Sequence, residues 1–304
     1  MKLLLLGANG QVGFELQRAL APLGELVCTT RSGRLPGGAD CEAVDMADAA
    51  GLESLLSREK PDVVVNAAAY TAVDRAEDEP ELAHAANAEA PATLARWCQQ
   101  RDALLLHFST DYVFDGRGTR PYKESDPVAP LGVYGASKFA GESAIRASGA
   151  RHFIFRTAWV YAARGQNFLR TMLRLGRERD RLRVVADQRG APTPARWIAA
   201  ATALAVQKQP QGFADARLGT FHLSAGGETT WHEFAQEIFA QARAAGLIER
   251  EPVVEAITTA EYPTRAARPA YSRLDNRRLY DALGLRLPEW RRGVSEVVAE
   301  LASS

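Results

Sequence analysis

Short apolar runs alternate with helical patterns through the first half of the chain. Continuous apolar runs predict strands at residues 2–6, 25–29, 41–44, 62–66, 103–108 and 152–156. The stretches between them predict helices at residues 11–21, 52–59, 80–100 and 133–148. Strands that are apolar along their whole length are usually covered on both faces. The order therefore predicts an α/β fold with a doubly wound parallel sheet.

This alternation weakens after residue 157. Helical patterns continue at residues 168–179, 197–207, 231–244 and 286–304, with a short predicted strand at 221–223. We expect residues 1–157 to form the sheet domain, completed by later segments near 190–220. Residues 158–304 are expected to form mainly a smaller C-terminal lobe, partly interleaved with the sheet.

Composition and charge narrow the class of protein. The 304 residues are 46% hydrophobic, which supports a sizeable core, and 37 basic residues balance 37 acidic ones. A net charge of zero argues against a nucleic-acid surface. Cys28, Cys41 and Cys98 are scattered and suggest no metal site. No apolar run approaches the length of a membrane span or a signal peptide, so we expect a cytoplasmic protein without a membrane partner.

A glycine-rich turn follows the first predicted strand and opens the first predicted helix. Its glycines permit a tight turn and close approach of the backbone to a pyrophosphate, which the helix N-terminus would face. Three glycines could form a turn and nothing more, but this position favours a dinucleotide site. The first domain is then a Rossmann-like dinucleotide-binding domain. The residues assigned to the cofactor here are Gly7, Asn9, Gly10, Gln11, Val12 and Gly13.

The ends of the later strands add to the cofactor site. NAD-preferring sites usually carry an acid after the second strand, whereas this chain has Arg31, which can meet a 2′-phosphate. We therefore expect NADPH, with NADH as the alternative if Arg31 is merely solvated. Asp45 is expected to meet the adenine or to cap the following helix. Ala67, Ala68 and Ala69 would let the ribose and nicotinamide lie against the backbone, unless they only fill space.

The candidate chemistry lies in Thr110, Tyr134 and Lys138. Tyr134 and Lys138 are four residues apart and share one face of a predicted helix, and Thr110 ends the preceding strand. Tyr134 is the candidate general acid and Thr110 a hydrogen-bond donor to a substrate carbonyl. Lys138 is expected to lower the pKa of the phenol and to hold the nicotinamide ribose. Each residue alone could be structural, but together with the glycine turn they indicate carbonyl reduction.

These motifs resemble the extended short-chain dehydrogenases/reductases. The resemblance narrows further, because segments along nearly the whole chain are similar to signatures of the dTDP-4-dehydrorhamnose reductases. These segments are residues 66–74, 109–116, 155–161 and 187–193, with Arg268-Pro269 and Ser272-Arg273-Leu274 near the C-terminus. The resemblance implies that NADPH reduces the C4 ketone of a nucleotide-linked deoxyhexulose, giving dTDP-L-rhamnose.

The resemblance also implies a set of substrate residues in the smaller lobe and at the strand ends. Val73, Asp111, Tyr112 and Trp159 would line the sugar pocket. Trp159 offers a flat apolar face to a deoxysugar, although it could equally be core packing. Arg268 and Arg273 are candidates for the diphosphate, since guanidinium groups pair well with phosphate oxygens, or they are only surface arginines.

Other activities on this scaffold remain as alternatives. Nucleotide-sugar dehydratases carry an Asp-Glu pair after the Thr, and Tyr112 cannot replace that acid, so simple reduction fits better. Another nucleotide-sugar reductase or an epimerase is the nearest enzymatic alternative. A non-catalytic subunit resembling the methionine adenosyltransferase beta subunit, or a redox-sensing transcriptional regulator, is disfavoured by the intact Thr110, Tyr134 and Lys138.

Some dTDP-4-dehydrorhamnose reductases are thought to dimerise around Mg²⁺ held by clustered Glu side chains. Glu15 and Glu300 match two such positions, but Arg196 stands where the third acid would be. A cation there would repel Mg²⁺, which prefers oxygen ligands. We therefore predict no metal and leave open whether the protein is a monomer or a homodimer.

Overall fold

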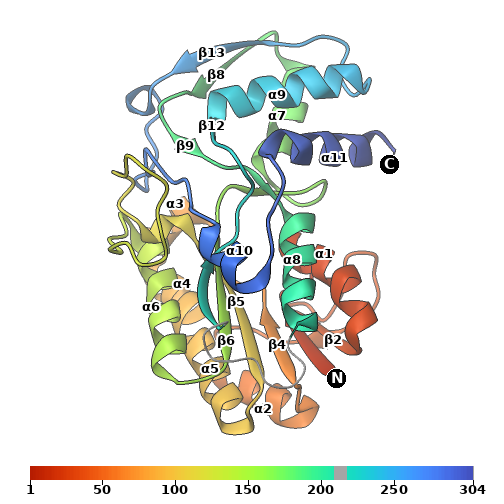
Figure 1. Ribbon diagram of the computed structural model, residues 1–304. Coiled ribbons are helices and arrows are strands. Elements are labelled where there is room, and N and C mark those ends of the chain that lie inside the picture. Colours follow the sequence, from red (N-terminus) through yellow and green to blue (C-terminus); the bar gives the residue numbers. More distant parts are fainter. Residues whose placement is uncertain (209–217, 304) are drawn as a thin grey trace.

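Seven parallel strands form the central sheet of the computed structural model, which describes residues 1–208 and 218–303 (Figure 1). The strand order is β11-β6-β5-β4-β1-β2-β3, so the chain winds outward in both directions from β1 and confirms the predicted doubly wound fold. The strand bounds are β1 Lys2–Leu6, β2 Glu25–Thr30, β3 Glu42–Ala43, β4 Val63–Asn66, β5 Leu104–Thr110, β6 His152–Thr157 and β11 Gly219–His222.

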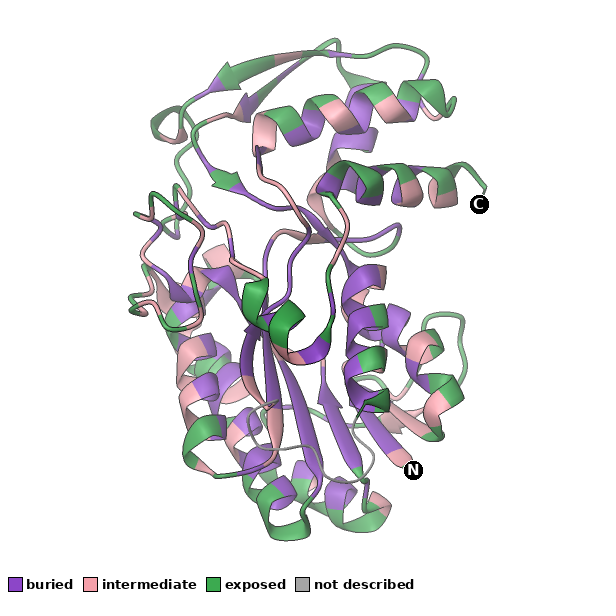
Figure 2. Ribbon diagram, in the orientation of Figure 1, coloured by how far each residue is buried: buried purple, intermediate pink, exposed green. Residues whose placement is uncertain are grey.

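Successive residues of β1 point to opposite faces of the sheet, and each face has its own core. Leu3 and Leu5 pack in the cluster that includes Leu16 and Ile198, which lie on α1 (Gln11–Leu20) and α8 (Ala195–Gln207). Leu4 and Leu6 belong to the opposite cluster, which is completed by the helices α2 (Ala49–Glu59), α5 (Ala90–Arg101) and α6 (Val133–Ala147). Burial on both faces explains why these strands are continuously apolar (Figure 2).

The helix predicted at 80–100 is interrupted. It consists of α4 (Pro80–His84), a π-helical turn η2 (Ala85–Glu89) and α5. Pro91 has no N–H, and its ring would crowd the carbonyl four residues earlier, on Asn87. The wider π turn relieves that conflict and turns the Asn87 carbonyl toward Gly141 of α6, where a Cβ would lie 2.1 Å from it.

The smaller lobe packs helices on a two-stranded parallel sheet, at the top of Figure 1. The core lies between α7 (Phe168–Glu178), α9 (Trp231–Ala244) and α11 (Trp290–Ala302), and includes Leu173, Phe234 and Val294. Thr230 caps α9 in a capping box with Glu233. The predicted terminal helix at 286–304 begins only at Trp290, after Pro288.

Several elements after residue 157 were not predicted, among them a pair of strands and a helix. The strands β8 (Arg181–Val185) and β13 (Val253–Ile257) pair in parallel although many residues separate them. In β8 exposed Arg181 and Arg183 alternate with buried Leu182 and Val184, a signal too short to recognise alone. The helix α10 (Arg277–Leu283) was also missed.

After the first elements of the smaller lobe, the chain returns to the sheet. Helix α8 covers one face of the sheet, and β11 then pairs with β6 at the sheet edge. Residues 209–217 of the segment expected to complete the sheet domain lie outside the described residues. The remaining short elements are η1 Ala21–Leu23, α3 Val73–Ala76, η3 Asp111–Val113, β7 Val160–Tyr161, β9 Arg189–Gly190, β10 Thr193–Pro194, β12 Thr229–Thr230 and η5 Thr259–Glu261.

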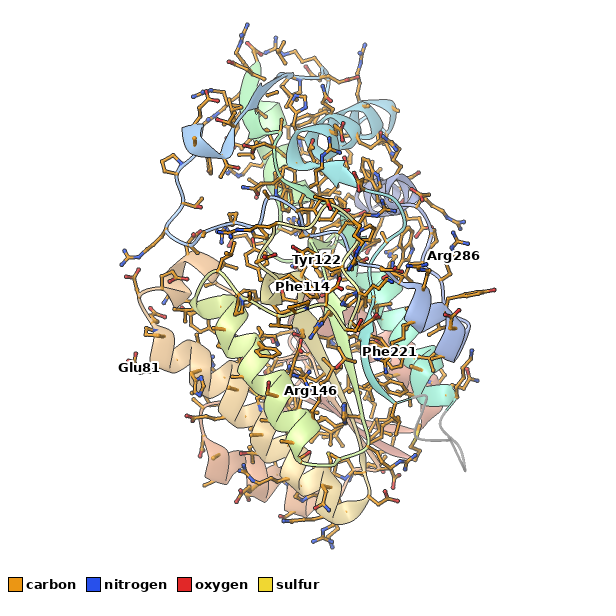
Figure 3. All side chains as sticks on the ribbon, turned by 60° about the vertical axis from the view of Figure 1, so that its left-hand side comes forward. Glu81, Phe114, Tyr122, Arg146, Phe221 and Arg286 are labelled. Atoms are coloured by element: carbon orange, nitrogen blue, oxygen red, sulfur yellow. The ribbon has the colours of Figure 1, made fainter. Side chains whose placement is uncertain are left out.

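The junction between the sheet and the smaller lobe has a small core of its own. Phe114 and Tyr122, both labelled in Figure 3, stack with ring centroids 4.2 Å apart. Val113, Ala158 and Leu274 complete this cluster, which supports the turn that follows β5. Within residues 1–208 and 218–303, no helix has the length and apolar character needed to cross a membrane.

Candidate active site

The glycine turn after β1 is packed so closely that two of its glycines admit no side chain. Gly7 has a φ of +76°, and a Cβ there would lie 2.7 Å from the Cα of Ala68. A Cβ on Gly13 would lie 2.0 Å from the carbonyl oxygen of Gly7. Helix α1 begins after Gly10 with no side chain capping its first N–H groups. An uncapped helix N-terminus behind a glycine turn is a suitable place for an anionic pyrophosphate.

Gln11 joins this turn to the smaller lobe. Its Oε1 accepts a hydrogen bond of 2.8 Å from Nδ2 of Asn167, whose own Oδ1 caps α7 by accepting from the Arg170 N–H. The Arg164 guanidinium lies 4.1 Å from the centre of the Phe14 ring on α1. Sequence reasoning missed Asn167 because its partner lies 156 residues away.

Arg31 and Asp45 come together at the end of β2. Arg31 Nε lies 3.7 Å from Asp45 Oδ2, and both side chains are largely exposed. Asp45 also accepts a hydrogen bond from the Ala47 N–H. The alternative role of Asp45 as helix cap is wrong, since Asp48 caps α2 by accepting from the Gly51 N–H. The two residues predicted to meet the adenosine end of the cofactor therefore form one charged pair.

The alanines after β4 lie against the glycine turn. Ala67, Ala68 and Ala69 are all half-buried, and the Ala68 N–H donates to Asn66 Oδ1 at 3.1 Å. The close approach of Gly7 to Ala68 brings this segment against the glycine turn.

Thr110 and Tyr134 face one another where β5 meets the start of α6. The Thr110 hydroxyl donates to Asp111 Oδ1 at 3.0 Å and accepts from the Tyr112 N–H at 3.2 Å. Gly135 lets α6 approach this turn, because a Cβ there would lie 2.2 Å from the Tyr112 carbonyl oxygen. Burial raises the pKa of Tyr134 to about 12, against a hydrogen bond with Thr110 that lowers it. The phenol therefore holds its proton at neutral pH and is able to donate it.

Lys138 is buried one helical turn further on. Its Nζ donates to the Phe108 carbonyl oxygen at 2.6 Å and lies 3.2 Å from Nε2 of His107. Burial lowers the pKa of Lys138 to about 8, while the Glu142 carboxylate raises it. Burial of the phenol dominates its pKa, and Nζ of Lys138 contacts His107 and Phe108, so the lowering of the Tyr134 pKa by Lys138 stays a prediction.

Of the predicted sugar-pocket residues, Asp111 and Tyr112 lie beside Tyr134. Asp111 is 2% exposed, and burial raises its pKa to about 6, against hydrogen bonds with Ser272 and Thr110 that lower it. By strict geometry its Oδ2 has no hydrogen-bond partner among the described residues. The rings of Tyr112 and Tyr134 meet edge to face at 5.6 Å, and burial raises the pKa of Tyr112. Val73 begins the short helix α3 and is half-buried.

Trp159 has a strained backbone and a stacked ring. Its φ is +48°, a conformation that a residue with a bulky side chain rarely adopts. Its ring lies flat on Trp231, with centroids 3.5 Å apart and planes 5° apart. Trp231, which sequence reasoning did not single out, is oriented by a hydrogen bond from its Nε1 to Gln188 Oε1.

Both arginines predicted for a diphosphate already have acidic partners. Arg268 Nη2 donates to Asp74 Oδ2 at 2.6 Å, and Arg273 Nη1 donates to Glu228 Oε2 at 3.1 Å. Each pair joins the C-terminal loop to a segment far away in the sequence, so these arginines also hold the site together.

The positions considered for a metal form an ion pair. Arg196 on α8 pairs with Glu300 on α11, and Glu15 lies near Arg18. In the described part of the chain, no cluster of three or more His, Cys, Asp or Glu side chains is arranged to hold a metal ion.

Comparison with known proteins places this geometry in context. Residues 1–303 match the family described as "RmlD substrate binding domain". The chain is 46% identical over its full length to the whole of a dTDP-4-dehydrorhamnose reductase from Burkholderia thailandensis. A solved dTDP-4-dehydrorhamnose reductase from Clostridium acetobutylicum has a TM-score of 0.88 at 35% identity, covering 99% of both chains. Another from Bacillus anthracis, solved in complex with NADP, has a TM-score of 0.86 at 33% identity, covering 98% of this chain and 99% of that one.

Proposed function

The chain belongs to the RmlD substrate binding domain family, and on that premise we propose that it is a dTDP-4-dehydrorhamnose reductase that uses NADPH. The observation that carries the proposal is the protonated Tyr134 phenol beside Thr110 at the carboxyl end of β5. The reaction adds a hydride to C4 of dTDP-4-dehydro-L-rhamnose and a proton to its oxygen, giving dTDP-L-rhamnose.

The residues around the glycine turn fit a dinucleotide. The first N–H groups of α1 would hold the pyrophosphate, and the half-buried Ala67–Ala69 segment would lie along the ribose and nicotinamide. Arg31 would pair with the 2′-phosphate of NADPH, exchanging its exposed contact with Asp45 for a phosphate. The reduced nicotinamide supplies the hydride.

The chain's own residues supply the proton and fix the ketone. Tyr134 gives its phenolic proton to the C4 oxygen while Thr110 donates a hydrogen bond to the same oxygen. The charged form of Lys138 stabilises the phenolate left behind and holds the nicotinamide ribose. Because Tyr134 has a raised pKa, it regains a proton readily after each turnover.

The sugar would lie against the ring of Trp159, with Val73, Asp111 and Tyr112 around it. The unpartnered Oδ2 of Asp111 is a suitable acceptor for a sugar hydroxyl. Arg268 and Arg273 would bind the diphosphate from the C-terminal loop. Tyr112 stands where dehydratases carry the Glu of their Asp-Glu pair, which supports reduction over dehydration.

The test is NADPH oxidation with dTDP-4-dehydrorhamnose as substrate. Wild type turns over, whereas Tyr134→Phe loses about 10²–10⁴-fold in kcat and keeps NADPH affinity. Equal rates in the two proteins would rule out Tyr134 as the acid. NADPH binding without turnover of the dTDP- or UDP-linked sugar would indicate a regulatory subunit instead.

A further inference from the structure

A buried row of polar side chains leads from the end of β4 through β5 to Lys138. Asn66 Nδ2 lies 3.1 Å from His107 Nδ1, and His107 Nε2 lies 3.2 Å from Lys138 Nζ. The three residues are at most 2% exposed, so water cannot serve as a substitute partner. The hydrogens in this row are therefore set by the protein alone.

A backbone N–H sets the direction of the row. The Ala68 N–H donates to Asn66 Oδ1 at 3.1 Å, and a backbone N–H can only donate. The amide group of Asn66 consequently presents its NH₂ to His107, and Nδ1 of His107 must accept. A neutral imidazole carries a single N–H, so the proton of His107 is on Nε2. Burial, followed by the charge of Lys138, lowers the pKa of His107 well below its usual value and keeps the ring neutral.

The Nε2–H group of His107 points at Lys138. An ammonium has only donors, so an N–H aimed at it is unfavourable, whereas a neutral amine offers a lone pair. Lys138 can accept from His107 and still donate to the Phe108 carbonyl at 2.6 Å only as the amine. The contact thus favours loss of the Lys138 proton, in the same direction as burial.

The other charged group near Lys138 acts in the opposite direction. Glu142 lies one turn further along α6, is fully buried, and raises the pKa of Lys138. It is bound by Arg146 at 2.9 Å and Arg156 at 2.7 Å, which offset its charge. Tyr134, one turn earlier, is protonated and neutral. Among the residues that the structure describes, His107 is the titratable ring in direct contact with Nζ, so its hydrogen decides between the charged and the neutral form of Lys138.

We propose that His107, held in its Nε2–H form by Asn66, is a positioning residue that donates a hydrogen bond to Lys138 and sets the pH at which Lys138 loses its charge. The proposal rests on the proposed reductase function, where that charge supports the Tyr134 phenolate. It also connects the charge to the cofactor side of the site, because Asn66 is fixed by the backbone of Ala68.

Two substitutions distinguish an effect of the His107 tautomer from an effect of side-chain packing. In Asn66→Asp one carboxylate oxygen still accepts from Ala68, while the other can accept only from a protonated Nδ1. His107 then switches to the Nδ1–H form, and Nε2 becomes an acceptor for the Lys138 ammonium. In His107→Phe the ring volume is kept and the donor is lost. His152→Phe, on β6, removes a half-buried imidazole and serves as the control.

Long-range ¹H–¹⁵N NMR of the histidine rings tests the tautomer directly, without any substrate. We expect wild-type His107, assigned by its loss in His107→Phe, to carry its proton on Nε2 and to stay neutral across the measured pH range. In Asn66→Asp the proton moves to Nδ1. A wild-type spectrum with the proton on Nδ1 would overturn the proposal even if the protein is a fully active reductase.

The pH profile of kcat/KM tests the consequence for Lys138. The alkaline limb should move upward by about 0.5–1 pH unit in His107→Phe and by about 1–2 units in Asn66→Asp. It should not move in His152→Phe. A purely structural role would lower the rate or stability and leave the limb in place, and that result would overturn the link to Lys138. If the protein reduces no sugar, ¹³Cε-lysine NMR gives the same titration, so the two failures are distinguished.

Discussion

The proposed cofactor side and the proposed substrate side of the site are held by different kinds of contact. The cofactor side, Gly7–Gly13 with Ala67–Ala69, rests on neighbouring strand ends and on backbone atoms so close that no side chain fits between them. The substrate side, with Trp159, Arg268 and Arg273, is joined to distant segments by ring stacking and ion pairs.

This difference predicts different tolerance to change. Backbone packing at the carboxyl ends of the strands cannot be adjusted without moving β1 or β4. A partly exposed ion pair contributes about 0.2–1 kcal/mol and can be replaced. The substrate side can therefore vary while the cofactor side stays the same.

The largest effect on this comparison is expected at Gly13, which packs directly against the backbone of Gly7. In Gly13→Ala the new Cβ would lie 2.0 Å from the Gly7 carbonyl oxygen, so the turn must open. Overpacking of this kind costs about 1–3 kcal/mol, which corresponds to as much as roughly 100-fold in the Kd for NADPH. Fluorescence titration measures the Kd for NADPH, and thermal unfolding measures the loss of stability. Gly10→Ala is the control, because its Cβ would lie 3.4 Å from that oxygen and stability should hardly change.

Arg31→Asp sharpens the comparison on the cofactor side, because it alters selectivity and leaves the turn intact. A charge-assisted hydrogen bond contributes about 1.5–3 kcal/mol, so the ratio of kcat/KM for NADPH to that for NADH should fall by about 10–100-fold. Arg174→Asp, an exposed arginine on α7, should leave this ratio unchanged. An unchanged ratio in Arg31→Asp would mean that Arg31 does not bind the 2′-phosphate.

On the substrate side, Trp231→Ala removes the ring on which Trp159 lies. Stacking contributes about 0.5–1.5 kcal/mol beyond buried area, so KM for the sugar nucleotide should rise by about 2–10-fold. The Kd for NADPH should not change, and Trp231→Phe should recover most of the loss. A change in cofactor affinity would contradict the separation of the two sides.

The smallest effect is expected at the pair of Arg268 with Asp74. Asp74 also accepts from the Ala266 N–H at 3.1 Å, and Asp74→Asn keeps a single acceptor oxygen for these two donors, so the C-terminal loop loses one of its two contacts with Asp74. KM for the sugar nucleotide should rise by about 2–5-fold, and less at high salt. A lower KM would show instead that Asp74 competes with the diphosphate for Arg268.

The pattern of the chain predicted the sheet and the local features around the glycine turn. The strands of the sheet, the turn Gly7–Gly13 and the spacing of Tyr134 and Lys138 are local features, and each has a local physical cause. The confirmed doubly wound parallel sheet follows from continuously apolar strands that alternate with helices. The π turn at Ala85–Glu89 was missed, although Pro91 is a local signal for it.

The pairings of the substrate side could not be predicted in the same way. Trp231 and Asn167 have partners many residues away. The sequence does not distinguish a Trp that stacks on another ring from one that is buried in a core. The parallel pair β8 and β13 was missed for the same reason, because each strand is too short to recognise without its partner. The raised pKa of Tyr134 came from burial, which no spacing reveals.

The sequence by itself determined the doubly wound sheet, the glycine turn and the identity of the candidate acid, because apolar periodicity and backbone freedom act over a few residues. Only the tertiary structure decided the charge states and the partners. Burial and hydrogen-bond direction at Lys138 depend on Asn66, His107 and Phe108, which meet there because β4, β5 and α6 are neighbours. The electrostatics of a buried group are set by everything that surrounds it, and the surroundings exist only in the folded chain.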